Sequence, residues 1–208
     1  MSGEAAGAGS REAWRAGAAA AWAAPRKTPE LRTDRLVIGQ LVPEDAPAIV
    51  RLAGAREIAD TTLSVPHPYE MRHAREFIAF AAHESAEGTG LHLAIRLAEG
   101  GGLIGAIGLK GMDGEHRVAE LGYWIGTEWW GRGYATEATG ALVRHAFDEL
   151  GLNRLQAHHM VRNPASGRVL EKAGFRREGV LRERVYRWGR FEDVVVYGIL
   201  RSDLADGA

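Results

Sequence analysis

The junction Gly131-Arg132-Gly133-Tyr134 constrains the fold of this chain more than any other segment. Before it, residues 118–125 are rich in the β-branched and aromatic side chains that are typical of a strand. After it, residues 135–150 place apolar side chains along one side of a helix. A strand that leads through glycines directly into a long helix predicts a mixed α/β fold. Neither Tyr134 nor Ala135 is a good capping side chain, so the first amides of this helix are expected to be free for another acceptor.

An anion is an acceptor that suits this junction. A helix N-terminus carries a partial positive charge of roughly half a unit, and glycines let the backbone approach a ligand closely. Together they form a cradle suited to a pyrophosphate, to which Arg132 can add charge. An ordinary loop with two glycines and an exposed arginine is the alternative interpretation. The segment is neither a Walker loop nor a dinucleotide fingerprint, because it lacks both Gly-Lys-Ser/Thr and Gly-x-Gly-x-x-Gly.

The chain from Leu31 onward predicts one domain over residues 31–203, in which strands and helices alternate. Strands are expected at residues 36–41, 91–97, 103–109, 118–125, 155–160, 178–187 and 191–200. Helices are expected at residues 43–53, 74–81, 135–150 and 165–173. This order predicts a single mixed α/β sheet with helices packed against it.

Residues 1–30 stand apart, because they are rich in Ala and Gly and carry few branched apolar side chains. Such a segment buries little surface, so we expect a flexible N-terminal extension. A helix that presents Trp14 and Trp22 to a partner protein is the alternative.

Charge and cysteine content exclude several classes of function. The net charge is −1, which gives no argument for a nucleic acid or an anionic membrane as partner. The chain has no cysteine, which excludes disulfides, thiolate nucleophiles and zinc–thiolate sites and leads us to expect a cytoplasmic protein. No apolar run approaches the ~20 residues that span a bilayer. His158 and His159 are adjacent and point to opposite strand faces, and no other spacing predicts a metal site.

Five segments resemble motifs of the GNAT acetyltransferase superfamily, in its RimJ/RimL-like branch. They are residues 123–126 with 130–138, residues 33–36, residues 68–69 with 77–78, residues 163–166 with 171–175, and residues 189–194. The resemblance covers residues 31 to about 202. It implies the GNAT fold, in which a mixed, mostly antiparallel central sheet is flanked by helices, and an N-acetyltransferase that uses acetyl-CoA as cosubstrate without a metal.

The resemblance assigns acetyl-CoA binding to the glycine junction and to the start of a later helix. The residues are Trp130, Gly131, Arg132, Gly133, Tyr134, Ala135, Thr136, Asn163 and Ser166. Trp130 departs from the Gln or Arg that many members carry there, which removes a side-chain contact to phosphate.

The reaction implied by the resemblance is direct: an amine attacks the acetyl carbonyl and the CoA thiolate leaves. Ser166 is then expected beside the pantetheine arm, where its hydroxyl donates a hydrogen bond to sulfur; alternatively it caps the following helix. Glu120 is the candidate general base and shares one strand face with Gly122 and Trp124. A structural ion pair between Glu120 and an arginine of a neighbouring strand is the alternative, and a bulge would change the face on which it lies.

The amine acceptor is less constrained. The resemblance places it between a lid at residues 61–69 and the last hairpin, with Tyr69, Tyr123 and Tyr186 as candidate substrate-binding residues. A protein N-terminal amine of the ribosomal-protein type and a small-molecule amine both fit. A non-catalytic acyl-CoA-binding module and a transferase of a longer acyl group are the alternative functions. A homodimer is an assembly that the sequence leaves open.

Overall fold

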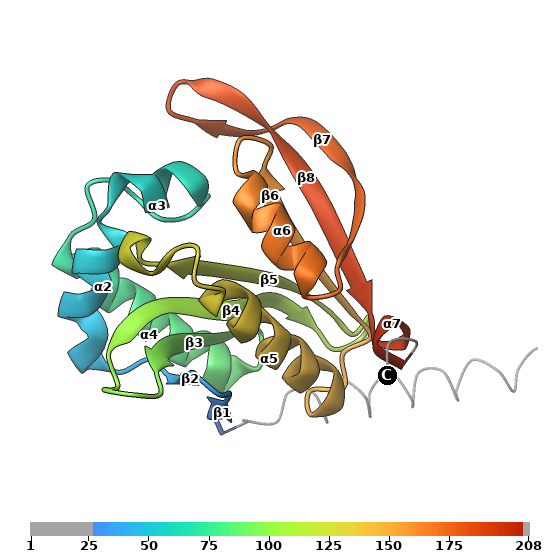
Figure 1. Cartoon of the computed structure of the whole chain (residues 1–208), viewed down its shortest axis with the longest axis horizontal. Helices are drawn as coiled ribbons and strands as arrows, with labels where there is room; N and C mark the ends of the chain where they lie inside the picture. Colours follow the sequence, from blue (N-terminus) through green and yellow to red (C-terminus); the bar gives the residue numbers. More distant parts are fainter. Residues whose placement is uncertain (1–26, 206–208) are drawn as a thin grey trace, which may run out of the picture.

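Eight strands form one sheet in the computed structural model, which describes residues 27–205 (Figure 1). Their order across the sheet is β1-β2-β3-β4-β5-β6-β8-β7. The strands are β1 (Leu31–Arg32), β2 (Leu36–Gln40), β3 (Leu91–Leu97), β4 (Leu103–Asp113), β5 (Val118–Ile125), β6 (Arg154–Met160), β7 (Arg176–Arg187) and β8 (Arg190–Leu200). All neighbouring strands are antiparallel except β5 and β6, which are parallel. The predicted mixed, mostly antiparallel sheet is confirmed.

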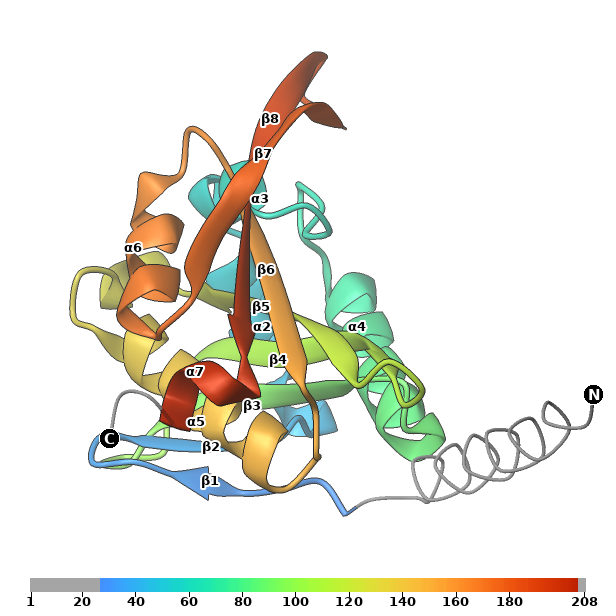
Figure 2. The same ribbon diagram turned by 90° about the vertical axis from the view of Figure 1, so that its right-hand side faces the viewer.

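Helices cover both faces of this sheet. They are η1 (Pro43–Asp45), α2 (Ala46–Ala53), α3 (Arg56–Thr61), α4 (Met71–Glu87), η2 (Thr127–Trp129), α5 (Tyr134–Asp148), α6 (Pro164–Lys172) and α7 (Arg201–Ala205). Apolar side chains of α5, such as Leu142 and Phe147, pack in one core with the sheet, and those of α2 and α4, such as Ile49 and Ile78, pack in a second core. The sheet therefore has an α5/α6 face and an α2/α4 face (Figures 1 and 2).

The parallel strands β5 and β6 are paired only at their N-terminal ends and diverge further along. Their ladder contains only Val118↔Arg154, Ala119↔Leu155 and Glu120↔Gln156, although both strands continue beyond these residues. Figure 2 shows β6, β7 and β8 turned steeply away from β2, β3 and β4. Beyond Glu120 the facing edges of the two strands leave an opening in the middle of the sheet.

The strand β5 keeps its register where the site predictions depend on it. Its pairing with β4 is continuous from Gly105↔Ile125 to Lys110↔Glu120, and the register shift lies further along, between Lys110 and Asp113. The alternation of side chains along residues 120–125 therefore holds. Tyr123 packs against the core of the α5/α6 face and Trp124 against that of the α2/α4 face.

The predicted strands and helices differ from the structure mainly at their ends. The predicted strand 91–97 and the predicted strand 118–125 match β3 and β5, while β4 continues to Asp113. Four short elements, β1, α3, η2 and α7, were not predicted. Residues 1–26 of the predicted N-terminal extension lie outside the described residues.

Candidate active site

A large cavity of about 920 Å³ occupies the opening between β5 and β6. Its wall combines residues of both strands with the glycine junction, the start of α5, the helix α6, part of α4 and the lid segment (residues 61–69). Segments that are far apart in sequence therefore meet around one space.

The start of α5 presents unpaired backbone amides to this cavity. Gly131 and Gly133 have φ angles of 74° and 81°, in the left-handed region that side chains other than glycine disfavour. No side chain caps the helix, and the bond from Glu137 N–H to the Gly133 carbonyl, 3.0 Å long, is the first bond of the helix. Within residues 27–205 the amides of Tyr134, Ala135 and Thr136 have no partner.

The space beside these amides suits an anion. A Cβ built on Gly131 would meet no atom within 4 Å, so the glycine is required by its φ angle, and the space beside it is open. The wall of the cavity includes Gly131, Gly133 and the residues 134–136. Free amides at a positively polarised helix end fit a pyrophosphate group.

Two residues before β2 hold the glycine junction in place. Thr33 Oγ1 donates to Glu137 Oε1 at 2.6 Å, and Arg35 Nε donates to Glu137 Oε2 at 2.7 Å. Arg35 Nη1 also donates to the carbonyl of Arg132 at 3.0 Å. Burial alone would raise the pKa of Glu137, but the hydrogen bonds from Thr33 and Arg35 hold it below its ordinary value. The sequence motif at residues 33–36 therefore fixes the loop and the first turn of α5.

The two large side chains of the junction have structural partners. Trp130 Nε1 donates to the carbonyl of Ile125 at 2.6 Å, while the residue remains 47% exposed at the cavity wall. The Arg132 guanidinium lies 5.1 Å from the centre of the Trp129 ring and is not part of the wall. The exposed-arginine interpretation of Arg132 is thus the one that the geometry favours.

Ser166 and Tyr123 meet on the α5/α6 side of the opening. Their hydroxyl oxygens are 2.9 Å apart, and both residues line the cavity. Asn163 is the N-cap of α6, where its Oδ1 accepts from the Ser166 amide at 3.4 Å. Because Asn163 caps the helix, the Ser166 hydroxyl is not the cap. It contacts the Tyr123 hydroxyl and lines the cavity instead. Burial raises the pKa of Tyr123 to about 12, although the hydrogen bond with Ser166 lowers it, so its hydroxyl stays protonated at neutral pH.

Glu120 lies on the α2/α4 side of the same opening. Its Oε1 is 2.8 Å from Lys110 Nζ and 3.1 Å from His158 Nδ1, so its partners are a lysine and a histidine and not the expected arginine. Burial lowers the pKa of His158 below its usual 6.5; Lys110 lowers it further, against the raising effect of Glu120. All three residues line the cavity. No sequence signal pointed to Lys110 or His158 as part of the site.

The lid segment lines the far part of the cavity, whereas no residue of the β7–β8 hairpin is part of the wall. Tyr69 lines the cavity, and burial together with the nearby charge of Glu76 raises the pKa of Tyr69 to about 12. Tyr186 is 65% exposed, packs against Phe191 with ring centres 5.0 Å apart, and does not line the cavity. Tyr186 as a substrate-binding residue therefore has no support from this geometry.

Two arginines connect the hairpin region to the α3–lid region; we call this contact the arginine clasp. Arg187 donates to the carbonyls of Ala59 at 2.7 Å and Leu63 at 3.2 Å. Arg162 donates to the carbonyl of Asp60 and, through Nε, to Glu192 at 2.8 Å. The clasp joins segments more than a hundred residues apart in the chain.

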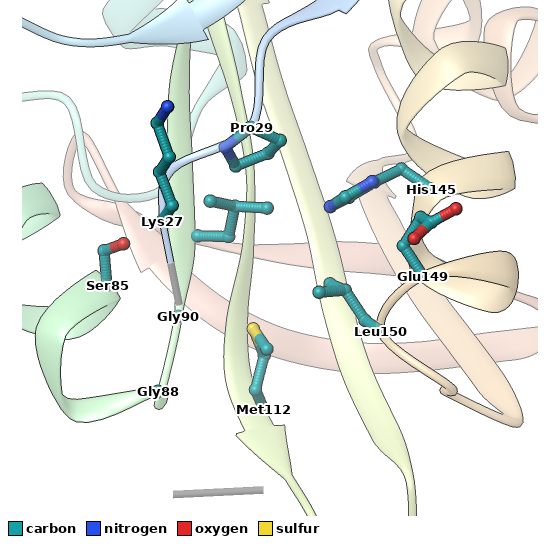
Figure 3. A pocket seen from close by; sticks show the side chains of 10 residues that line it. Lys27, Pro29, Ser85, Gly88, Gly90, Met112, His145, Glu149 and Leu150 are labelled. Carbon is teal, nitrogen blue, oxygen red and sulfur yellow. The ribbon is translucent and has the colours of Figure 1, made fainter. Parts of the chain in front are cut away.

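A second, smaller hollow of about 190 Å³ lies beside the C-terminal end of α5 (Figure 3). Lys27 and Ser85 line one side of it, and His145 and Glu149 from α5 line the other. It shares no wall residue with the large cavity and contains none of the predicted site residues.

Metal ligands and membrane spans are both missing from the part of the chain that the structure describes. Within residues 27–205, no group of three or more His, Asp or Glu side chains is placed to hold a metal ion. Among the helices of the same residues, none is long and apolar enough to cross a membrane.

Comparisons with known proteins identify the family of the chain. Residues 35–176 match the family model of the acetyltransferase (GNAT) domain. The chain is 35% identical to the uncharacterized N-acetyltransferase YoaA of Bacillus subtilis over 173 residues, which are 83% of this chain and 97% of that protein. It is 31% identical to the [ribosomal protein uS5]-alanine N-acetyltransferase of Escherichia coli over 94 residues, 45% of this chain and 48% of that protein.

A solved structure shows the same fold. The spermidine N-acetyltransferase of Vibrio cholerae, in complex with CoA and spermine, superposes with a TM-score of 0.72 at 27% identity, covering 83% of this chain and 99% of that one. The match of the family model and the 35% identity to YoaA over most of both chains together establish the family of this chain. The chain belongs to the GNAT acetyltransferase family and is an N-acetyltransferase.

Proposed function

We propose that this enzyme transfers the acetyl group of acetyl-CoA directly to the N-terminal amine of a protein or peptide. The observation that carries the proposal is the arrangement around the opening between β5 and β6. Free amides at the start of α5 lie at one part of the cavity wall, the Ser166–Tyr123 pair lies on one face of the sheet, and Glu120 with His158 lies on the other.

The donor side fits acetyl-CoA. The residues at 131 and 133–136 would hold its pyrophosphate through backbone amides, which needs no side-chain charge from Trp130 or Arg132. Bound there, acetyl-CoA supplies an activated acetyl group on a thiolate leaving group. The CoA in the structure of the Vibrio cholerae relative supports this assignment.

The protonated hydroxyls beside the opening suit the leaving sulfur. Tyr123 stays protonated because its pKa is about 12, and it can donate to Ser166 Oγ at 2.9 Å. The Ser166 proton is then free to form a hydrogen bond with a thiolate, which stabilises charge as it develops. Asn163 keeps Ser166 at the first turn of α6 by capping that helix.

The charges in the cavity favour an acceptor with a single cationic amine. Among residues 27–205, only Glu76 and Glu120 contribute carboxylates to its wall, and Glu120 already contacts Lys110. A polyamine carries several positive charges, and each would need a carboxylate or full solvation. Between them, the lid segment and the helices on this side add apolar and aromatic side chains such as Ile58, Val65 and Phe77, together with neutral hydroxyls of Thr and Ser. This lining suits the first residues of a peptide better than spermidine.

The test compares acceptors that differ in one feature. CoA release from acetyl-CoA is measured with an alanine-initiated peptide, with the same peptide blocked at its N-terminus, and with spermidine. We expect the free peptide to be acetylated at its N-terminal nitrogen, as mass spectrometry would show, with kcat/KM at least about tenfold above spermidine, a difference of roughly 1.4 kcal/mol. Equal or faster turnover of spermidine, or acetylation of the blocked peptide, would contradict the acceptor proposal.

Two further measurements address the alternatives. Tight binding of acetyl-CoA in calorimetry without CoA release from any amine would favour a binding module. Faster turnover of propionyl-CoA than of acetyl-CoA would favour a longer acyl group. The homodimer stays a prediction, which sedimentation of the purified chain would test.

A further inference from the structure

We propose that His158 takes the proton from the attacking amine and that Glu120 acts as a positioning residue for His158. The proposal rests on transfer to an amine at the site described above and adds the identity of the proton acceptor. It assigns to His158 the role that the sequence suggested for Glu120.

Strand register places both residues on the α2/α4 face of the sheet, where the amine acceptor is expected. Glu120 is paired with Gln156 across β5 and β6, so their side chains point to the same face. His158 follows Gln156 by two residues along β6 and shares that face. The ladder ends at Glu120, so His158 is the next side chain of this face on β6, beside the opening. Ser166 and Tyr123 lie on the opposite face, where the leaving sulfur is expected.

The contact at Nδ1 favours one tautomer of His158. Glu120 Oε1 lies 3.1 Å from Nδ1, and a carboxylate there favours the neutral imidazole that carries its proton on Nδ1. The other nitrogen, Nε2, then has a lone pair and can accept a proton. No hydrogen bond of Nε2 is found within residues 27–205, and the His158 side chain remains 24% accessible at the cavity wall.

Lys110 is the second partner of Glu120. Its ammonium lies 2.8 Å from Glu120 Oε1, the same oxygen that faces His158 Nδ1, so two neighbours hold this carboxylate in place beside the imidazole. The same cation disfavours a charged imidazole. The groups that act on His158 are Glu120 on β5, Lys110 on β4, Arg184 on β7 and His159 on β6, in addition to burial.

The proposed step is balanced in atoms and charge. The neutral amine nitrogen forms a bond with the acetyl carbonyl carbon, and the surplus proton on nitrogen passes to Nε2 of His158. The carbon–sulfur bond breaks, and the leaving thiolate accepts a hydrogen bond from the Ser166 hydroxyl. The thiolate then takes a proton from water while imidazolium His158 releases one to water, so that one amide and one thiol are formed.

The test is the pH dependence of an activity ratio. Wild type and His158→Gln are assayed with the same peptide, so the ionisation of the peptide amine cancels in the ratio of their kcat/KM values. We expect a ratio of about 10²–10³ around neutral pH and above, the usual effect of a general base. Protonated His158 cannot accept a proton. The ratio should therefore fall about tenfold per pH unit below its pKa, which lies under 6.5.

His92 provides the matched control. It lies on the same sheet face, lines the same cavity and contacts a glutamate, with Nε2 at 2.6 Å from Glu84 Oε2, but it is on β3, two strands away from the opening. His92→Gln need not have the turnover of wild type. The ratio of wild-type kcat/KM to His92→Gln kcat/KM should nevertheless stay constant as the pH changes.

A rescue experiment separates a chemical role from a structural one. Exogenous imidazole should restore turnover of His158→Ala in proportion to its concentration, but it should not restore turnover of Glu120→Gln. A wild-type/His158→Gln ratio that is below threefold or constant with pH would overturn the assignment, as would failure of imidazole to rescue a folded His158→Ala that still binds acetyl-CoA. Absence of wild-type turnover with every amine would instead contradict the proposed function.

Discussion

Replacement of Arg35 by Ala should weaken acetyl-CoA binding although Arg35 does not line the cavity. Arg35 connects the chain before β2 to the glycine junction through Glu137 and the carbonyl of Arg132. Without the Arg35 side chain, Glu137 keeps the hydrogen bonds from Thr33 Oγ1 and from the backbone amide of residue 35, but the Arg132 carbonyl loses its guanidinium partner. The amides at the start of α5 would then be less well ordered before the ligand binds.

The expected size of the effect follows from the exposure of the pair. A fully buried hydrogen bond to a charged group contributes about 1.5–3 kcal/mol, whereas an exposed ion pair contributes about 0.2–1 kcal/mol. The Arg35 side chain is 48% exposed and that of Glu137 is 18% exposed, so the bonds to Glu137 and to the Arg132 carbonyl fall between these limits. We expect these bonds together to contribute about 1–2 kcal/mol to the binding free energy of acetyl-CoA. Their loss then corresponds to a 5–30-fold rise in the Kd for acetyl-CoA.

Calorimetric titration with acetyl-CoA measures this change, and kcat at saturating acetyl-CoA should change little. Arg32→Ala is the matched control, because Arg32 pairs with Glu30 on the surface, with side chains 69% and 56% exposed. Its Kd should stay within about twofold of wild type. If the Kd of Arg35→Ala for acetyl-CoA lies within twofold of the Kd values of wild type and of Arg32→Ala, the view that Arg35 orders the loop is refuted.

Three further predictions concern the α6 start and the loop. Ser166→Ala should lower kcat by about tenfold, the value of one hydrogen bond to a charged group, while the Kd for acetyl-CoA stays within twofold; unchanged turnover would remove Ser166 from the mechanism. Asn163→Ala should lower the free energy of unfolding by about 1 kcal/mol through loss of the α6 cap, measured as urea denaturation against the exposed Asn153→Ala; equal stability of the two variants would contradict the cap. Glu137 has a lowered pKa, so its contribution to stability is complete above its ordinary value of 4.5 and is lost as pH falls through the lowered value. The difference in the free energy of unfolding between wild type and Glu137→Gln should therefore be constant near neutral pH and shrink in acid. A difference that grows in acid would contradict a lowered pKa of Glu137.

Local chemistry made much of the fold predictable. The apolar stripe of residues 135–150 and the strand content of residues 118–125 identified α5 and β5 within two residues, because each element signals itself over consecutive positions. The short helix α3 was missed because six residues provide less than two turns of periodicity. The strand β1 has only two residues, and its pairing with β2 is visible only in three dimensions.

The contacts that complete the site could not be read from spacing along the chain. Arg35 and Glu137 are 102 residues apart, and no periodicity connects them. The pairing of Glu120 with Lys110 depends on the register of β4 with β5, and its contact with His158 depends on β6 being the next strand in the sheet. The sequence supported only an arginine as a generic partner for Glu120, because the identity of a cross-strand neighbour needs the strand order.

The arginine clasp has a consequence for attempts to change the acceptor by exchanging segments between relatives. Arg187 and Arg162 come from the last third of the chain, while the carbonyls that they hold belong to residues 59–65. A chimera that received only a new lid would keep the old arginines against carbonyls in different positions, and a chimera with only a new hairpin would have the converse defect. Acceptor preference should therefore move between homologues as a two-part module, with residues 56–69 and 162–192 exchanged together.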